Sequence, residues 1–296
     1  MSIVELVGPC TDGLAPYSHW GILPLVFGFL LKKWFFDLWD NFLPLIVVNL
    51  GFVLVAVVIG TAPGLVAPDG TIAFFAVMGL LTACGFVYLG GVVGAARKAA
   101  DFGSVGWQEF AGGFRRFFKP SLGLGVLVVL HIVVAGIATV FYAQFLRVDQ
   151  DATRALETQN VLGIVALGIL FWVSVLWWLV AQYFLTVADR LDRRGKRAFR
   201  SSLLLVADNV PFTLGMAFVA GLIAVLSLVT AFLLPGIAGL ALWYQDGIRL
   251  LMYKYDYLEE NPEASRRDIP WDELLYDDRE RVGKRTLRGM IFPWRD

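Results

Sequence analysis

Histidine and cysteine are scarce in this chain of 296 residues, which contains two of each. Two cysteines cannot build a metal cluster, and Cys84 lies inside an apolar run, where a thiol behaves as a small hydrophobic side chain. The motifs GxxxxGK(S/T), GxGxxG, GxSxG and HExxH are also absent. We therefore expect a protein that is not an enzyme and that binds no metal or cofactor. No cationic segment follows Met1, so we expect no cleavable signal peptide.

Hydrophobic residues, in contrast, make up 58% of the chain, and its mean hydropathy is +0.68. Soluble domains are typically about 45–50% apolar. The excess is concentrated in runs long enough to cross the hydrocarbon core of a bilayer. The composition therefore predicts an all-α, polytopic membrane helical bundle.

Six apolar runs are expected to cross the membrane as three hairpins. Each hairpin follows a cytoplasmic amphipathic helix, and Pro44, Pro120 or Pro211 begins its first span, where the missing N–H does no harm. In the second unit, aromatic residues recur at helical spacing from Trp107 to Phe118, which predicts one membrane-facing side. The predicted spans cover residues 44–61, 71–93, 120–145, 161–187, 211–234 and 237–253.

The chain divides into a polar and interfacial segment (1–31), a six-span membrane domain (32–258) and a charged cytoplasmic tail (259–296). Alternate connections carry most of the Lys and Arg residues, which places both termini in the cytoplasm. The bilayer is an expected partner, and nucleic acid is not. The cations expected to contact lipid headgroups are Lys32, Lys33, Arg115, Arg116, Lys119, Arg193, Arg194, Lys196 and Arg197.

Polar residues inside the predicted spans are the candidate functional residues, because they are costly within a membrane. His131 could relay protons or bind a ligand, but a hydrogen bond to a neighbouring helix is the favoured role, as it is for Asn49 and Gln182. Asp246 and Arg249 lie three residues apart and are expected to pair with each other. The alternative role for this pair is a gate or a solute contact.

The tail contains a partial apolar face. Trp271, Leu274, Leu275 and Trp294 are candidate residues for docking a cytosolic or membrane partner. The alternative is a tail that is flexible or that folds back onto the cytoplasmic surface of the bundle.

Three stretches resemble the YesL-like family of bacterial integral membrane proteins: DNFLPLIVVNLGF (40–52), FRRFFKPSLGLG (114–125) and AFRSSLLLVADNVPFTLGMA (198–217). The resemblance covers about residues 27–255. It implies a location in a bacterial inner membrane and a link to carbohydrate uptake and breakdown systems, and it transfers no catalytic residues. The long charged tail departs from the family pattern.

These observations favour a non-catalytic accessory or scaffold protein, with a link to a carbohydrate transport system implied by the resemblance. The alternative is a small-solute permease, or the membrane subunit of a transporter, with a polar path through the bundle.

The predicted orientation is testable by labelling. A cysteine placed at Ala67 should react with an impermeant reagent from outside the cell, and one at Ser201 should not, because positive charge retains its connection in the cytoplasm. Labelling of the cysteine at Ser201 alone would show that the topology is the inverse of the predicted one.

Overall fold

The computed structural model describes residues 23–67, 72–143, 158–192, 195–266, 269–283 and 285. The regular elements in these ranges are helices, which confirms the all-α class. Arg193, Arg194, Trp294 and the predicted interfacial residues 1–22 lie outside the described residues. The helices are α2 (Leu23–Asp40), α3 (Phe42–Val66), α4 (Ile72–Ala100), α5 (Trp107–Ala143), α6 (Thr158–Arg190), α7 (Lys196–Asp208), α8 (Val210–Val229), α9 (Gly236–Glu260), α10 (Trp271–Leu274) and α11 (Tyr276–Val282).

Five of the described helices are long and apolar enough to cross a membrane: α3, α4, α5, α6 and α8. The sixth predicted span, residues 237–253, lies in α9, which is not among them. Helix α9 is less apolar because it carries Gln245, Asp246 and Arg249. The side chains of Gln245 and Asp246 are fully buried in the protein. The chain is thus a multi-pass membrane protein, whereas the arrangement of six spans stays a prediction.

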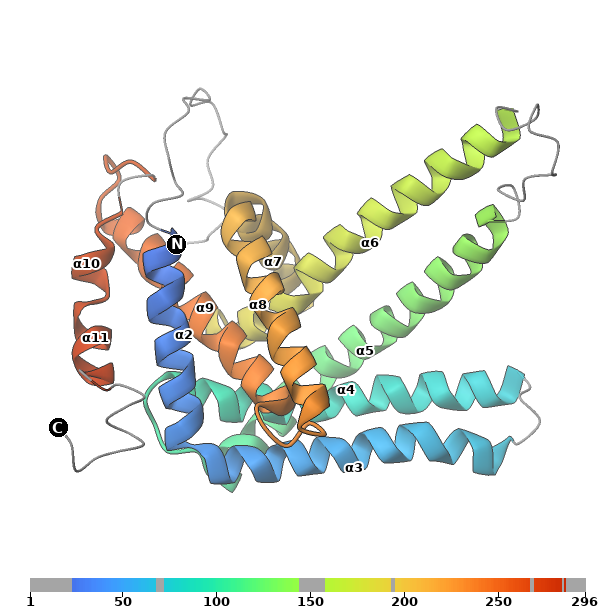
Figure 1. Cartoon of the computed structure of the whole chain (residues 1–296), viewed down its shortest axis with the longest axis horizontal. Coiled ribbons are helices and arrows are strands. Elements are labelled where there is room, and N and C mark those ends of the chain that lie inside the picture. The colour runs from blue at the N-terminus through green and yellow to red at the C-terminus, as the bar shows by residue number, and fades with distance from the viewer. Residues whose placement is uncertain are drawn as a thin grey trace.

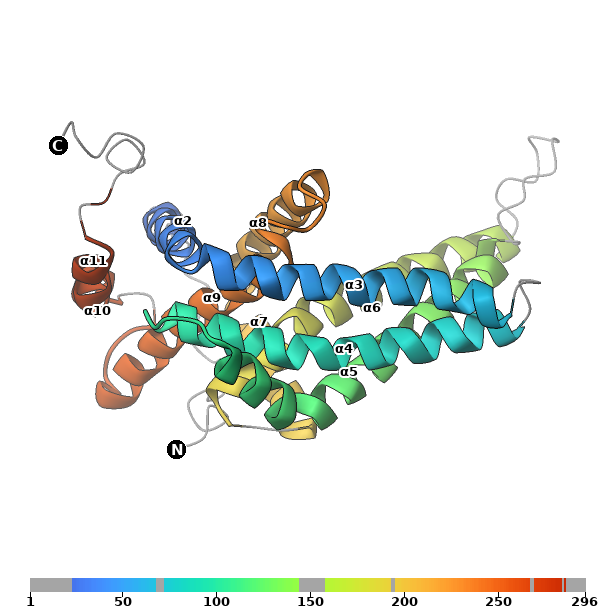
Figure 2. The same cartoon turned by 90° about the horizontal axis from the view of Figure 1, so that it is seen from below.

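The long helices α3 to α6 form two hairpins that diverge from a common base (Figure 1). The pair α3 and α4 runs side by side, and the pair α5 and α6 leaves the base at an angle to it. Figure 2 shows α2, α9 and the α10–α11 segment gathered at the base end. The main hydrophobic core lies there, with Tyr183, Leu242 and Trp243 fully buried between α6, α9 and their neighbours.

Helix α5 is continuous from Trp107 to Ala143, so the predicted boundary at Pro120 between a surface helix and a span is wrong. Membrane helices tolerate an interior proline when neighbouring groups satisfy the freed backbone carbonyl. The predicted membrane-facing aromatic side is also divided: Phe110 and Phe117 are buried in the bundle, whereas Trp107 is 75% exposed. Pro44 and Pro211 do lie in the first turns of α3 and α8, as expected.

A seam of glycines lets α4 and α5 approach closely. A Cβ atom added at Gly94 would lie 2.8 Å from the Glu109 carbonyl oxygen, and one at Gly113 would lie 2.7 Å from the Gly90 carbonyl oxygen. Small residues at such contacts are the usual means by which membrane helices pack. The seam brings the C-terminal end of α4 and the N-terminal part of α5 into one unit at the base.

The chain positions proposed for the labelling experiment are buried, since Ala67 is 7% and Ser201 is 1% exposed. Ile72 and Tyr276, at 89% and 65% exposed, are better reporters for the two sides. The predicted orientation itself stays a prediction.

The glycine seam yields a matched pair of substitutions in adjacent residues. Gly113→Ala should lower the apparent unfolding temperature, because overpacking costs about 1–3 kcal/mol. Gly112→Ala has nothing within 4 Å of its new Cβ atom and should be neutral or slightly stabilising. The measurement is thermal unfolding of both variants in the same detergent, and equal effects would contradict the close packing.

Candidate functional site

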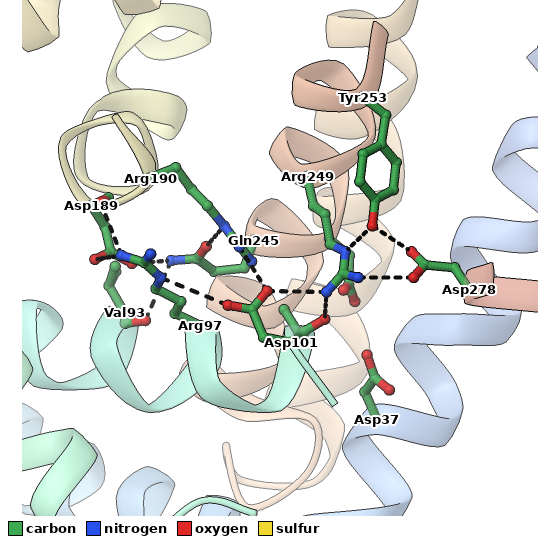
Figure 3. A network of polar contacts seen from close by, with 12 residues as sticks. Asp37, Val93, Arg97, Asp101, Asp189, Arg190, Gln245, Arg249, Tyr253 and Asp278 are labelled. Carbon is green, nitrogen blue, oxygen red and sulfur yellow. Dashed lines mark hydrogen bonds and ion pairs between the residues drawn. The ribbon is translucent and has the colours of Figure 1, made fainter. Parts of the chain in front are cut away.

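The candidate site is a cluster of charged and polar side chains at the base, which we call the basal ion network (Figure 3). Helices from distant parts of the sequence contribute to it, and most of its members are at least half buried. It consists of Lys33 and Asp37 from α2, Arg97 and Asp101 at the end of α4, Asp189 and Arg190 from α6, Gln245, Asp246 and Arg249 from α9, and Asp278 from α11.

The C-terminal end of α4 is the centre of the network. The Ala100 carbonyl oxygen accepts hydrogen bonds from Lys33 Nζ and from Arg249 Nη1, each at 2.8 Å. The next residue, Asp101, accepts from Arg190 Nη1 at 2.7 Å and from Arg249 Nη1 at 3.0 Å. A helix C-terminus carries partial negative charge and unpaired carbonyls, so it favours cations.

Phe102 follows this helix end in a left-handed backbone conformation, with φ of 59°. A bulky side chain rarely adopts this region, and the cost is about 1–3 kcal/mol. The ring it positions lies 4.4 Å from Lys33 Nζ and 5.1 Å from the Arg249 guanidinium carbon. Cation–π attraction to two desolvated cations offsets part of the backbone strain.

The most buried part of the network is Lys33 with its two carboxylates. Lys33 is 1% exposed and Asp246 is 0% exposed, and Lys33 Nζ lies 2.6 Å from Asp246 Oδ1. Lys33 also forms an ion pair with Asp37, one helical turn away. Burial raises the pKa of Asp37 to about 7, and the nearby Asp246 carboxylate adds to the rise. Burial alone would lower the pKa of Lys33, but Asp246 and Asp37 raise it above its ordinary value.

A second part of the network joins α4, α6 and α9. Asp189 accepts a hydrogen bond from Arg97 Nη1 at 2.9 Å and from Gln245 Nε2 at 2.9 Å. Arg190 Nε in turn donates to Gln245 Oε1 at 2.8 Å. Asp189, Arg190 and Gln245 thus each have a partner on another helix, which lowers the cost of burying them.

The tail segment is docked onto the same network. Arg249 Nη2 donates to Asp278 Oδ1 at 2.8 Å, and the Tyr253 hydroxyl donates to Asp278 Oδ2 at 3.2 Å. Leu275, a predicted docking residue for a partner, is 0% exposed, so the prediction of a partner contact at this side chain is wrong. Trp271 and Leu274 are half-buried and pack against the same core.

The polar residues predicted for the spans do not come together. Asn49 binds the α8–α9 connection: its Nδ2 donates to the Leu233 and Pro235 carbonyls at 2.9 Å, and its Oδ1 accepts from Ala238 N–H. His131 stacks on Trp177, with ring centroids 5.5 Å apart. These contacts fit the structural role that the sequence favoured for such residues, although they are ring stacking rather than hydrogen bonding at His131.

Gln182 and the predicted pair in α9 have other partners. Gln182 Oε1 accepts a hydrogen bond from the Tyr244 hydroxyl at 3.1 Å, beside an apolar cavity of about 410 Å³ between α4, α5, α6, α8 and α9. Asp246 and Arg249 were expected to pair with each other, and this expectation is wrong. Asp246 binds Lys33, whereas Arg249 binds the end of α4 and the tail.

The predicted headgroup cations also separate into classes. The prediction of a headgroup contact for Lys33 is wrong, because its ammonium group lies in the protein interior between two carboxylates. Lys32 is exposed and donates to the Gly283 carbonyl oxygen at 3.0 Å, and Arg116 pairs with Asp192 at 2.9 Å. The other described members are exposed, and they are Arg115, Lys119, Lys196 and Arg197.

Sequence reasoning missed most of the network. Its members Asp37, Asp101, Asp189 and Asp278 had no assigned role. One signal was present: Lys33 and Asp37 are spaced one helical turn apart, as are Arg97 and Asp101. The pairing between α2, α6 and α9 had no sequence signal, because it joins residues more than 50 positions apart.

The fold and this site define a multi-pass, all-helical membrane protein whose base is held by internal ion pairs. Comparisons with models of known protein families, with the curated proteins and with the solved structures find no match. The resemblance to the YesL-like family therefore stays a prediction.

Docking of the tail is testable with two adjacent aspartates. Asp278→Ala removes hydrogen bonds to a charged partner, so opening of α11 should become easier by about 1.5–3 kcal/mol. Trypsin should then cleave at Arg279 and Arg281 at least about 10-fold faster. Asp277, which is exposed, provides the control: Asp277→Ala should leave the cleavage rate unchanged. Equal rates in both variants would show that the Arg249 contact does not hold the tail.

Proposed function

We propose that the protein is a non-catalytic accessory or scaffold protein of the bacterial inner membrane, with both termini in the cytoplasm, and that it binds another integral membrane protein. The observation that carries this proposal is a contrast within one chain. The base is tightly packed and most of its charged side chains pair with one another, whereas the outer halves of the hairpins are packed against little else.

The α5–α6 hairpin is the part of this surface that we propose as the partner contact. In α5, no side chain from 129 to 143 is buried, and in α6 only Gly163 is buried between 161 and 179. The most apolar window of α6 is 6% buried, which is the lowest value among the five candidate spans. Helices in membranes associate by packing small residues closely, so an unpacked apolar hairpin suits a second membrane protein.

Two glycines favour this hairpin further. Gly136 in α5 and Gly168 in α6 are exposed, and an added Cβ atom at either would meet nothing within 4 Å. The backbone of a partner helix can approach closely at both positions. The rigid base then serves as the fixed end of the arm, because an ion pair joins α4 to α6 and hydrogen bonds of Gln245 join α6 to α9.

The permease alternative receives less support from the geometry. It needs a polar path, but Asn49, His131 and Gln182 contact separate elements of the chain. The cavity beside Gln182 is lined mainly by apolar side chains, which suits an acyl chain better than a polar solute. The resemblance to the YesL-like family makes a carbohydrate transporter the first partner to test.

The test is a purification of the full-length protein from its native membrane in mild detergent, with quantitative mass spectrometry of co-eluting proteins. We expect a stoichiometric membrane partner with the wild type and its loss with the double variant Gly136→Leu/Gly168→Leu, because leucine side chains separate the helices. Gly60→Leu is the matched control: it is exposed in α3, with nothing within 4 Å, and should keep the partner.

Two outcomes would contradict the proposal. A wild-type protein that elutes alone would remove the scaffold role, and transport by reconstituted vesicles would then support the permease. A partner that stays bound to the Gly136→Leu/Gly168→Leu protein would show that the α5–α6 hairpin is not the contact.

A further inference from the structure

A polar pocket of about 350 Å³ lies over the most buried part of the basal ion network. It is formed by the end of α2, the segment after α4 and the region of α11. Asp37 lines this pocket from inside, and Arg281 and Arg285 line it from the tail. Asp37 is 5% exposed, so its carboxylate is at the boundary between the pocket and the interior.

The charges behind the pocket do not balance. One ammonium group, Lys33, lies between two carboxylates, Asp37 and Asp246. Asp246 Oδ2 is buried and has no hydrogen-bond partner, although Oδ1 binds Lys33. Two carboxylates against one ammonium leave one negative charge in a region of low dielectric, where an unpaired charge is strongly unfavourable.

The surrounding cations are engaged elsewhere. Arg249 and Arg190 hydrogen-bond to Asp101, Asp278 and Gln245, and neither forms an ion pair with Asp37 or Asp246. At the mouth of the pocket Arg285 pairs with Asp40, and Arg281 lies over the Phe102 ring. These cations stabilise the charged carboxylates at a distance, but none of them is in direct contact with Asp37 or Asp246.

The cation that neutralises the second carboxylate has to be small. A divalent or alkali cation needs several oxygen ligands, and no group of three or more His, Cys, Asp or Glu side chains in the described part of the chain could hold a metal ion. A proton needs only one carboxylate oxygen. Like-charged carboxylates that share a site commonly hold one proton between them.

We propose that Asp37 and Asp246 together bind one exchangeable proton beside the Lys33 ammonium, and that the pocket over Asp37 connects this site to solvent. The ligand is the proton, and the two carboxylates act as one unit. Removal of either carboxylate leaves a neutral pair with Lys33, so neither residue keeps the proton without the other.

The pKa of Asp37 agrees with this geometry, since it is raised from 3.8 to about 7. The folded protein therefore binds more protons than the unfolded chain between these values. The free energy of unfolding should fall as the pH rises through this window, because stability falls with pH where the native state holds the extra proton. Asp37→Asn should remove this part of the pH dependence.

Infrared spectroscopy of the full-length protein tests the proposal directly. Protein containing ¹³C-labelled aspartate would be titrated in nanodiscs between about pH 5 and about pH 9, where ordinary carboxyls are ionised. We expect the C=O band of one protonated aspartate that disappears near neutral pH. Absence of such a band in the wild type throughout this range would overturn the proposal, whatever the variants do.

Single variants assign the band. Asp37→Asn and Asp246→Asn should each abolish it completely, which is the signature of a shared proton. Asp40→Asn, one turn from Asp37 and half exposed, should leave it unchanged. Asp256→Asn is the second control, because burial and the neighbouring Glu259 and Glu260 carboxylates also raise the pKa of Asp256.

Loss of the band only in Asp256→Asn, or its survival in either Asp37→Asn or Asp246→Asn, would overturn the proposal. If one of these two variants fails to fold, the other, together with the wild-type titration, decides the question. Lys33→Met gives an independent check. It removes the competing cation, so the band should persist to a pH about one unit higher or more.

Discussion

The C-terminal end of α4 is the point on which the base of this protein depends. The Ala100 carbonyl and the left-handed turn at Phe102 meet there. Lys33 and Arg249 both donate hydrogen bonds to the carbonyl oxygen, and both lie over the Phe102 ring. Lys33 and Arg249 come from helices more than 200 residues apart in the sequence. Hydrogen bonds that involve a charged group contribute about 1.5–3 kcal/mol each. The helix end therefore determines where α2 and α9 lie.

The glycine seam between α4 and α5 serves the same arrangement. Because Gly94 and Gly113 bring the two backbones together, the segment that connects them is short and begins with Asp101 and Phe102. A bulkier residue in the seam would displace the helix end that the cations contact. The glycine contacts and the ion network are thus linked. The glycine contacts position the C-terminal end of α4, and the charged side chains bind to that helix end. Beyond this region the two hairpins diverge (Figure 1).

The membrane class, the positions of the long apolar helices and the prolines that begin α3 and α8 could be predicted, because each depends on local composition. The start of the third span could not, since Pro120 lies inside one continuous helix. A proline indicates a helix start only where the preceding turn lacks other support. Here the preceding turns carry Phe110 and Phe117, which are buried against neighbouring helices and keep the helix intact. Tertiary packing outweighed the local signal.

Local composition established that the chain is a membrane protein, since its apolar runs are long enough to cross the hydrocarbon core of a bilayer. It did not indicate that five Lys and Asp side chains in the described part of the chain are buried, which are Lys33, Asp37, Asp189, Asp246 and Asp278. Tertiary structure alone decided which of them pair. Asp246 and Arg249 are neighbours on one helix face, yet each contacts a different element. Asp246 binds the buried ammonium group of Lys33, and Arg249 binds Asp278 in the tail. Lys33 illustrates the same rule: from composition it belongs at the lipid surface, but two buried carboxylates hold it in the interior.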